Sequence, residues 1–365
     1  MLKKNEGLTN FQCSALLAST IIGVVVISLP KTAAVSAQEG AVISTLVAGL
    51  LTIIIATCIA ALGKRFHNKT IIEYSTLLLG KSLGMLFGAI IIFYYILVAS
   101  IILRGFSDSL KNLLLEHTPL EIIMISMLLT ATYLTLNGIS GIAKISEIFL
   151  PIIVGSLLLV IGLSMNNFDF VNFRPVLMPS ISSAIKCIPD LVIGFQGYEI
   201  LFIMIPFMHD YRKVIPYTVV GVAIPVILYT LLVGMSIGVF GVHITQQLNY
   251  PTITLAETIT FPGAFMERFD ILFVILWIIA AFTTIANLYY MASLTSIRLL
   301  GLRHYKVSIY LLSPVIYIAA ILPQNTLEIR KVTMLAGYIG IAISFITIGL
   351  LFLSWISGKR EKENV

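Results

Sequence analysis

The chain is poor in charge. Only 11% of its 365 residues are Asp, Glu, Lys or Arg, whereas 58% are hydrophobic and the mean hydropathy is +1.02. A soluble domain carries roughly 25% charged residues, so this composition cannot supply a water-facing surface. The sequence therefore predicts an integral membrane protein with one domain over residues 1–365 and no water-soluble module.

Residues that bind metals or perform catalysis are also scarce. Three cysteines are scattered without paired spacing, and five histidines fall in different loops. This distribution argues against a disulfide framework or a metal site. Neither a nucleophile–base pair nor a glycine-rich phosphate loop is recognisable. We expect no enzyme activity, no catalytic residues, no metal and no cofactor.

Long apolar runs dominate the sequence instead. A run of roughly 20 residues crosses about 30 Å of hydrocarbon as a helix, whereas a barrel strand alternates in polarity over about ten residues. The runs predict an all-α protein with ten transmembrane helices. The predicted spans are 7–30, 40–63, 82–103, 122–143, 148–168, 191–208, 214–242, 271–297, 307–327 and 332–358. The longer loops 64–82, 166–183 and 242–267 are expected to hold surface helices, and the last resembles the lid loops of transporters.

The basic residues predict the orientation. With ten spans both termini lie on one side, and that side holds 15 of the 23 Lys and Arg residues. The positive-inside rule then places both termini in the cytoplasm. The net charge of +6 follows from this topology and does not indicate nucleic-acid binding.

The two halves of the chain look related. Spans one to five occupy 7–168 and spans six to ten occupy 184–358, and an odd number of spans per half makes the second repeat inverted. Gly23 in the first span and Gly194 with Gly197 in the sixth weaken the helices at corresponding places. Interruptions at matching positions of two halves are the best sequence indication of a transporter-type binding site.

The sixth span contains the most informative residue, Glu199. A carboxylate within a membrane is costly and usually faces a cavity or a partner. If the helix unwinds at Gly197, freed carbonyl oxygens and Glu199 could hold an ammonium group, or Glu199 could carry a coupling proton. The alternative is a protonated Glu199 that serves packing only.

The first span offers the complementary chemistry. An unwound stretch at Gly23 would expose backbone N–H groups that suit a carboxylate, and Thr20 could add a hydroxyl. The alternative is that Gly23 only allows close helix packing. Thr283 and Asn287, spaced i, i+4, share one face of the eighth span, and Tyr94 lies in the third. These side chains either line a ligand site or are ordinary residues of membrane helices.

Several segments carry a resemblance to a known family. They are Phe11-Gln12, Gly23 with Leu29-Pro30, Asn172-Phe173-Arg174-Pro175-Val176-Leu177, Gly197-Tyr198-Glu199 with Pro206, Glu267-Arg268-Phe269, Trp277-Ile278-Ile279 and Phe282-Thr283-Thr284. Together they resemble the spore germination permeases, the B-subunits of nutrient germinant receptors, within the amino acid–polyamine–organocation transporter superfamily. The resemblance runs over nearly the whole chain.

The resemblance implies a ten-helix, LeuT-like fold with an inverted five-plus-five repeat and broken first and sixth helices. It implies residence in the bacterial spore inner membrane and a complex with an A-subunit and a lipoprotein C-subunit. It also implies a small nutrient ligand (an amino acid, a sugar or a nucleoside) bound among spans one, three, six and eight. The candidate ligand-binding residues are Thr20, Gly23, Val24, Tyr94, Val98, Gly194, Gln196, Gly197, Tyr198, Glu199, Thr283 and Asn287.

One position departs from the wider superfamily. Its transporters often carry a second glycine two residues after Gly23, where this chain has Val25, and that weakens the case for exposed backbone amides. We predict a germinant-binding receptor subunit that triggers spore germination. The alternatives are a proton-coupled amino acid transporter and an ion-conducting subunit of the receptor complex.

Overall fold

The computed structural model describes residues 7–173, 181–259, 269–301 and 304–360, and the elements that these residues form are helices. The α-helices are α1 (Asn10–Ile21), α2 (Leu29–Ala37), α3 (Ala41–Arg65), α4 (Ile71–Leu79), α5 (Lys81–Leu113), α6 (Leu120–Leu136), α7 (Gly138–Ser164), α8 (Ile181–Gly194), α9 (Leu201–Met204), α10 (Val214–Gln247), α11 (Pro251–Glu257), α12 (Phe269–Leu300), α13 (Tyr305–Ile321) and α14 (Thr326–Ile356). The 3-10 helices are η1 (Val24–Ile27), η2 (Gln38–Gly40), η3 (Met165–Asn167), η4 (Phe170–Phe173), η5 (Tyr198–Ile200), η6 (Ile205–Phe207) and η7 (Tyr211–Lys213).

Six helical stretches in the described part of the chain are long and apolar enough to cross a membrane, and a seventh forms if the bent pair around Gly194 is one span. The helices α6 and α13 are apolar but shorter, at 17 residues each. The all-helical membrane architecture is confirmed, while the number of ten spans remains a prediction. The helices α1 to α7 lie within 7–168, and α8 to α14, apart from the first residues of α8, lie within 184–358. The division into two five-span halves also remains a prediction.

Two span boundaries differ from the prediction. The turn between the fourth and fifth spans lies at Asn137-Gly138, where Gly138 has a φ of +75°, so the predicted boundary between 143 and 148 is wrong. The boundary was inferred from the charged residues Lys144 and Glu147, but both lie inside α7. Lys144 is exposed there, and the Glu147 carboxylate accepts a hydrogen bond from Gln12 Nε2 at 2.9 Å.

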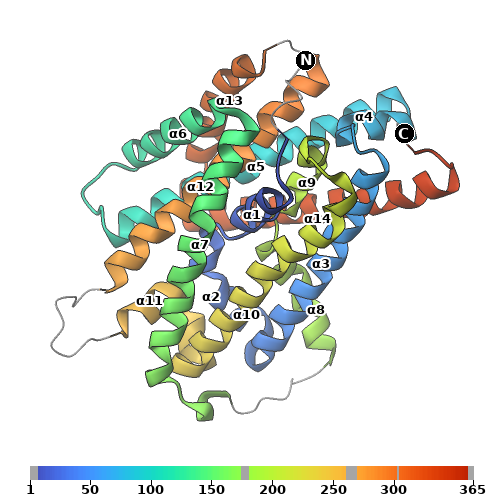
Figure 1. Cartoon of the computed structure of the whole chain (residues 1–365). Coiled ribbons are helices and arrows are strands. Elements are labelled where there is room, and N and C mark those ends of the chain that lie inside the picture. Colours follow the sequence, from blue (N-terminus) through green and yellow to red (C-terminus); the bar gives the residue numbers. More distant parts are fainter. Residues whose placement is uncertain (1–6, 174–180, 260–268, 302–303, 361–365) are drawn as a thin grey trace.

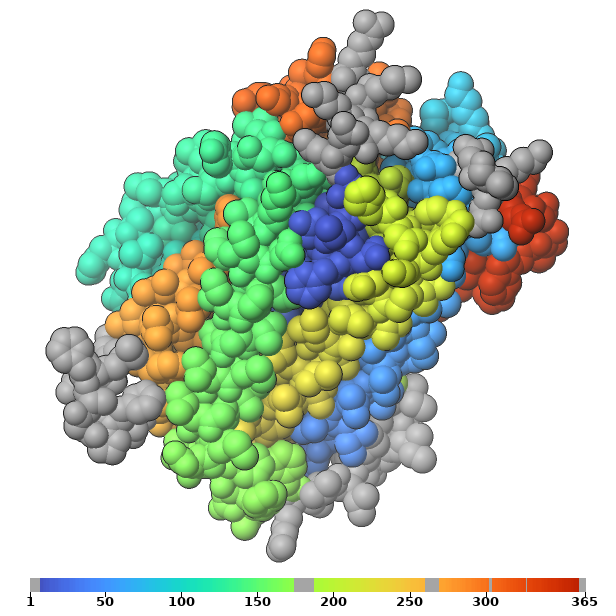
Figure 2. All heavy atoms as spheres, in the orientation of Figure 1, coloured from blue at the N-terminus to red at the C-terminus, as the bar shows by residue number. Residues whose placement is uncertain are grey.

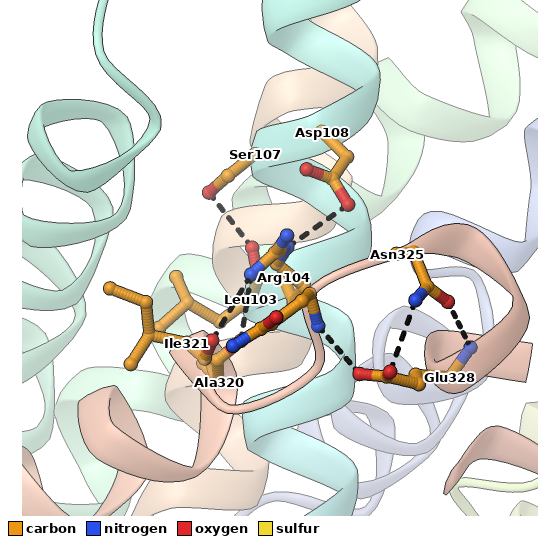
Figure 3. A network of polar contacts seen from close by, with 9 residues as sticks. Leu103, Arg104, Ser107, Asp108, Ala320, Ile321, Asn325 and Glu328 are labelled. Atoms are coloured by element: carbon orange, nitrogen blue, oxygen red, sulfur yellow. Dashed lines mark hydrogen bonds and ion pairs between the residues drawn. The ribbon is translucent and has the colours of Figure 1, made fainter. Parts of the chain in front are cut away.

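The third span was also predicted too short, because α5 continues beyond Leu103 to Leu113. Arg104 therefore lies within a helix and is only 8% exposed. Its guanidinium pairs with Asp108 at 3.0 Å and reaches the carbonyl oxygens of Ala320 and Ile321 at the end of α13 (Figure 3). A cation at a helix C-terminus is favourable, so Arg104 joins the ends of α5 and α13.

Two of the three loops contain an α-helix, although both helices bury side chains in the protein and are not surface helices as predicted. The loop 64–82 contains α4, which begins with a capping box of Thr70 and Glu73, and the loop 242–267 contains α11. The loop 166–183 has η4 and the start of α8, although 174–180 lie outside the described residues.

The centre of the molecule holds α1, with α7, α10 and α12 packed around it (Figure 1). On one face α1 reaches the surface between α7 in green and the yellow segment that includes α10 (Figure 2). In the most apolar stretches of α10 and α12, 61% of residues are buried inside the protein, against 39–44% in the other long spans. The outer faces of α3, α5, α13 and α14 carry exposed large apolar side chains, as a lipid-facing surface requires.

Candidate functional site

The first span breaks where its glycine and proline predict. The helix α1 ends at Ile21, and α2 begins only at Leu29. Between them Gly23, with φ −108° and ψ −138°, leads into η1. A Cβ added at Gly23 would lie 2.8 Å from Thr284 Oγ1, so α12 approaches the break as closely as a glycine allows. The break and the close packing are therefore both present at this residue.

The sixth span breaks at Gly194 to Gly197, and its two parts are bent by 60°. The φ of Gly197 is +132°, a conformation that residues with a side chain rarely adopt. A Cβ there would lie 3.1 Å from the backbone of Thr20 and of Ile21. The two broken spans thus touch, backbone against backbone, and the predicted breaks in both spans are confirmed.

Glu199 lies at this junction and is fully buried. Its Oε2 accepts a hydrogen bond from the Gly197 N–H at 2.7 Å. The Tyr94 hydroxyl interacts with the same carboxyl group, yet no described group meets hydrogen-bond geometry at Oε1. A buried acceptor without a partner costs about 1–3 kcal/mol, so a donor added at Oε1 would stabilise the junction.

Tyrosine hydroxyls donate to a main-chain carbonyl at each break, including one in the sixth span, where free carbonyls were expected. The Tyr95 hydroxyl donates to the Glu199 carbonyl at 2.7 Å, and the Tyr229 hydroxyl donates to the Ile21 carbonyl at 2.8 Å. The Gly23 N–H donates to the same Ile21 carbonyl at 2.9 Å. These groups already have partners, so a ligand that binds at the break would need other acceptors, such as the Glu199 side chain.

The eighth predicted span, which corresponds to α12, forms hydrogen bonds with the first span. Thr284 Oγ1 donates to the Ser19 carbonyl at 2.9 Å. Asn287 Nδ2 donates to Thr20 Oγ1 at 2.8 Å and to Ser19 Oγ at 3.3 Å, while Asn287 Oδ1 lacks a partner among the described groups. Thr283 donates only within its own helix, to the Ala280 carbonyl. Asn287 therefore faces the break as expected, whereas Thr284, which was not predicted, makes the contact expected of Thr283.

Two predicted apolar residues lie toward one end of this region. Val24 Cγ1 is 3.8 Å from the position that a Cβ would take at Gly105 of α5, and Gly105 is two helical turns from Val98. Val24 and Val98 are both only partly buried. The structure therefore brings Thr20, Gly23, Tyr94, Gly197 and Glu199 together. Val24 of η1 packs against α5 farther toward the C-terminal end of that helix, near Gly105.

The last helix, α14, forms a wall that the sequence analysis missed. Gln196 Nε2 donates to the Gly337 carbonyl at 2.8 Å, and the Tyr198 hydroxyl is 3.1 Å from Ser344 Oγ. A Cβ at Gly340 would lie 2.5 Å from Gln196 Nε2 and 2.8 Å from the Tyr94 hydroxyl. The small residues 337, 340 and 344 share one helix face, and this pattern is a sequence signal for close helix packing.

Gly194 has a packing role at the same break. A Cβ added to it would lie 2.7 Å from Leu29 Cδ1, so Gly194 sits against the start of α2. Within the described ranges, no three His, Cys, Asp or Glu residues gather as a metal centre requires. The motif residues 174–177 and 267–268 lie outside the described residues.

Known proteins share both the sequence and the fold. A sequence profile of the family described as spore germination protein matches residues 7–329. Spore germination protein A2 of Bacillus subtilis (strain 168) is 26% identical to this chain, over 95% of both chains. Spore germination protein B2 of the same organism is 27% identical, over 98% of both chains.

Two solved transporters share the fold. Mhp1, a nucleobase-cation-symport-1 family transporter in a closed conformation with bromovinylhydantoin bound, has a TM-score of 0.68 at 15% identity, over 95% of this chain and 78% of that one. A single-substitution mutant of the Eremococcus coleocola manganese transporter has a TM-score of 0.68 at 14% identity, over 95% and 85%. These likenesses establish a LeuT-like transporter fold. With the profile match covering most of the chain, the protein belongs to the spore germination protein family.

Proposed function

We propose that this chain is the nutrient-binding membrane subunit of a germinant receptor. Its small ligand binds between the broken first and sixth spans, and binding triggers germination. The observation that carries the proposal is the fully buried Glu199 carboxyl group at the junction of the two breaks. It interacts with the Tyr94 hydroxyl, and no group in the described part of the chain meets strict hydrogen-bond geometry at its Oε1. Buried polar groups are nearly always paired, and an ionisable group in a membrane helix is by default a functional candidate.

The geometry favours a ligand that donates hydrogen bonds to Glu199. An ammonium or amide group at Oε1 would have the Tyr94 hydroxyl close by, because this hydroxyl interacts with the Glu199 carboxyl group. The Gln196 amide lies beside the Tyr94 hydroxyl, since both approach Gly340. Amino acids, amino sugars and nucleosides all carry such donors. An amino acid is the first choice, because its ammonium group would form an ion pair with Glu199, which has none within the described ranges.

The receptor setting is part of the same proposal. The homologues are named spore germination proteins, so we place this chain in the spore inner membrane with both termini on the core side. An A-subunit and a lipoprotein C-subunit are its expected partners. A ligand shifts the conformation of such a complex only through its differential affinity for the two states.

Glu199→Gln tests this function. The glutamine carbonyl can still accept from the Gly197 N–H, so the break keeps its shape, while the charge is lost and an NH2 donor can occupy the position of Oε1. We expect the germination dose–response of spores carrying the variant to shift by at least about tenfold in nutrient concentration, the effect of losing one charge-assisted hydrogen bond. Glu121→Gln, at an exposed carboxylate of α6, is the matched control. An unchanged response of Glu199→Gln at normal protein level would remove Glu199 from the site.

Secondary transport is the second candidate, because the solved neighbours are transporters of this fold. A transporter would accumulate labelled substrate in liposomes without any partner. A receptor subunit would bind substrate without accumulating it.

A further inference from the structure

The short helix α11, in the segment between α10 and α12, is built into the protein. Thr252 and Leu255 are fully buried, whereas a surface helix was expected here. Its end is held by α7 and η3, since Ser164 Oγ donates to the Leu255 carbonyl at 3.4 Å and Asn167 Nδ2 donates to the Thr258 carbonyl at 3.2 Å. The helix is therefore packed between the spans and held there by these hydrogen bonds.

The inner face of α11 binds the broken first span directly. Thr252 Oγ1 donates to the Val26 carbonyl at 2.8 Å, and both residues are buried. In a continuous α-helix this carbonyl would accept from the N–H four residues later, but that residue is Pro30, which has none. Pro30 thus leaves an acceptor that Thr252 satisfies.

The bond holds a segment that has few other restraints. Val26 belongs to η1, which is four residues long and has no side-chain cap at Gly23. A helix this short gains little from its own hydrogen bonds, so its position depends on the groups packed against it. Gly23 meets α12 through Thr284, and Val26 meets α11 through Thr252.

We propose that Thr252 is a positioning residue, which couples the break in the first span to α11. This inference rests on the proposed function, in that the ligand is taken to bind beside η1. A ligand that moves η1 must carry α11 with it or break the bond at Thr252. Since α11 precedes the eighth span on the side opposite the predicted cytoplasmic termini, the coupling carries the state of the site to the outer face of the membrane.

The first test needs no ligand. Thr252→Val removes the hydroxyl at nearly constant volume, Thr252→Ser keeps it, and Thr254→Val removes a hydroxyl from a half-buried position of the same helix. Hydrogen–deuterium exchange of the full chain in lipid nanodiscs is measured for the amides of 23–28 and 251–257. We expect Thr252→Val to raise exchange in both segments by roughly 5- to 150-fold, the effect of leaving one buried acceptor unpaired. The other two variants should match the wild type.

Two ligand-free results would overturn the proposal. One is unchanged exchange of 23–28 in Thr252→Val, and the other is an equal increase in Thr252→Ser or Thr254→Val. If Thr252→Val is too unstable to purify, Thr252→Ala takes its place. Its exchange is then compared with that of the wild type and of Thr252→Ser, with the same expected results.

The second test adds a mixture of the proteinogenic amino acids and common nucleosides. We expect protection of both segments in the wild type but of 23–28 alone in Thr252→Val. Protection of 23–28 without 251–257 in the wild type would refute the coupling. Protection of neither segment would contradict the proposed function, while the ligand-free comparison would still decide the role of Thr252.

Discussion

Gly197→Ala tests the contact between the two broken spans. The φ of Gly197 is +132°, and a residue with a side chain in such a region costs about 1–3 kcal/mol. The new Cβ would also lie 3.1 Å from backbone atoms of Thr20 and Ile21. Backbone atoms cannot swing aside as a side chain can, so this overpacking adds about 1–3 kcal/mol. The free energy of unfolding should fall by about 2–6 kcal/mol in total.

Thermal unfolding of the purified protein in detergent measures this loss. With an unfolding entropy of about 2.1 cal/mol/K per residue, 1 kcal/mol corresponds to about 1.3 °C in a chain of 365 residues. We therefore expect the midpoint of Gly197→Ala to fall by roughly 3–8 °C. Gly349→Ala in α14 is the matched control, because its Cβ would meet nothing within 4 Å and alanine favours a helix. If both variants melted at the wild-type temperature, the close approach of the two breaks would be refuted.

Three further substitutions test other parts of the account. Gly340→Ala would place its Cβ 2.5 Å from Gln196 Nε2 and 2.8 Å from the hydroxyl of the buried Tyr94. It should weaken ligand binding about tenfold, measured by titration of the purified protein, and lower stability by about 1–3 kcal/mol through overpacking. Tyr229→Phe removes the donor to the Ile21 carbonyl and should lower stability by about 1–3 kcal/mol in thermal melts. Arg104→Met should lower stability by a similar amount in the same assay, since it removes the charge that joins α5 to α13. A wild-type melting point for either of the last two would show that the bond contributes nothing.

The sequence predicts local breaks well, because glycine and proline act through the backbone of their own segment. Gly23 and Gly197 lie at the breaks for this reason, and Pro30 has no N–H that could pair with the Val26 carbonyl. The burial of Glu199 was also predictable, since a lone carboxylate in an apolar span has few alternatives.

Contacts between distant segments were less predictable. Adjacent helix positions differ by about 100°, so Thr283 and Thr284 could not be distinguished without knowing which face meets the first span. The tyrosine partners of the Ile21 and Glu199 carbonyls come from helices remote in sequence. The boundary between the fourth and fifth spans was predicted wrongly from Lys144, because a charged residue can lie within a helix when its side chain reaches the surface.

Binding to the purified protein in liposomes tests the central claim most directly. Wild type, Glu199→Gln and Glu121→Gln are incubated with a labelled mixture of amino acids and nucleosides, and bound and accumulated label are measured separately. The account predicts saturable binding without accumulation in the wild type and in Glu121→Gln, and loss of most of that binding in Glu199→Gln. Equal binding by all three proteins would contradict a ligand site at Glu199, and accumulation above empty liposomes would make the protein a transporter.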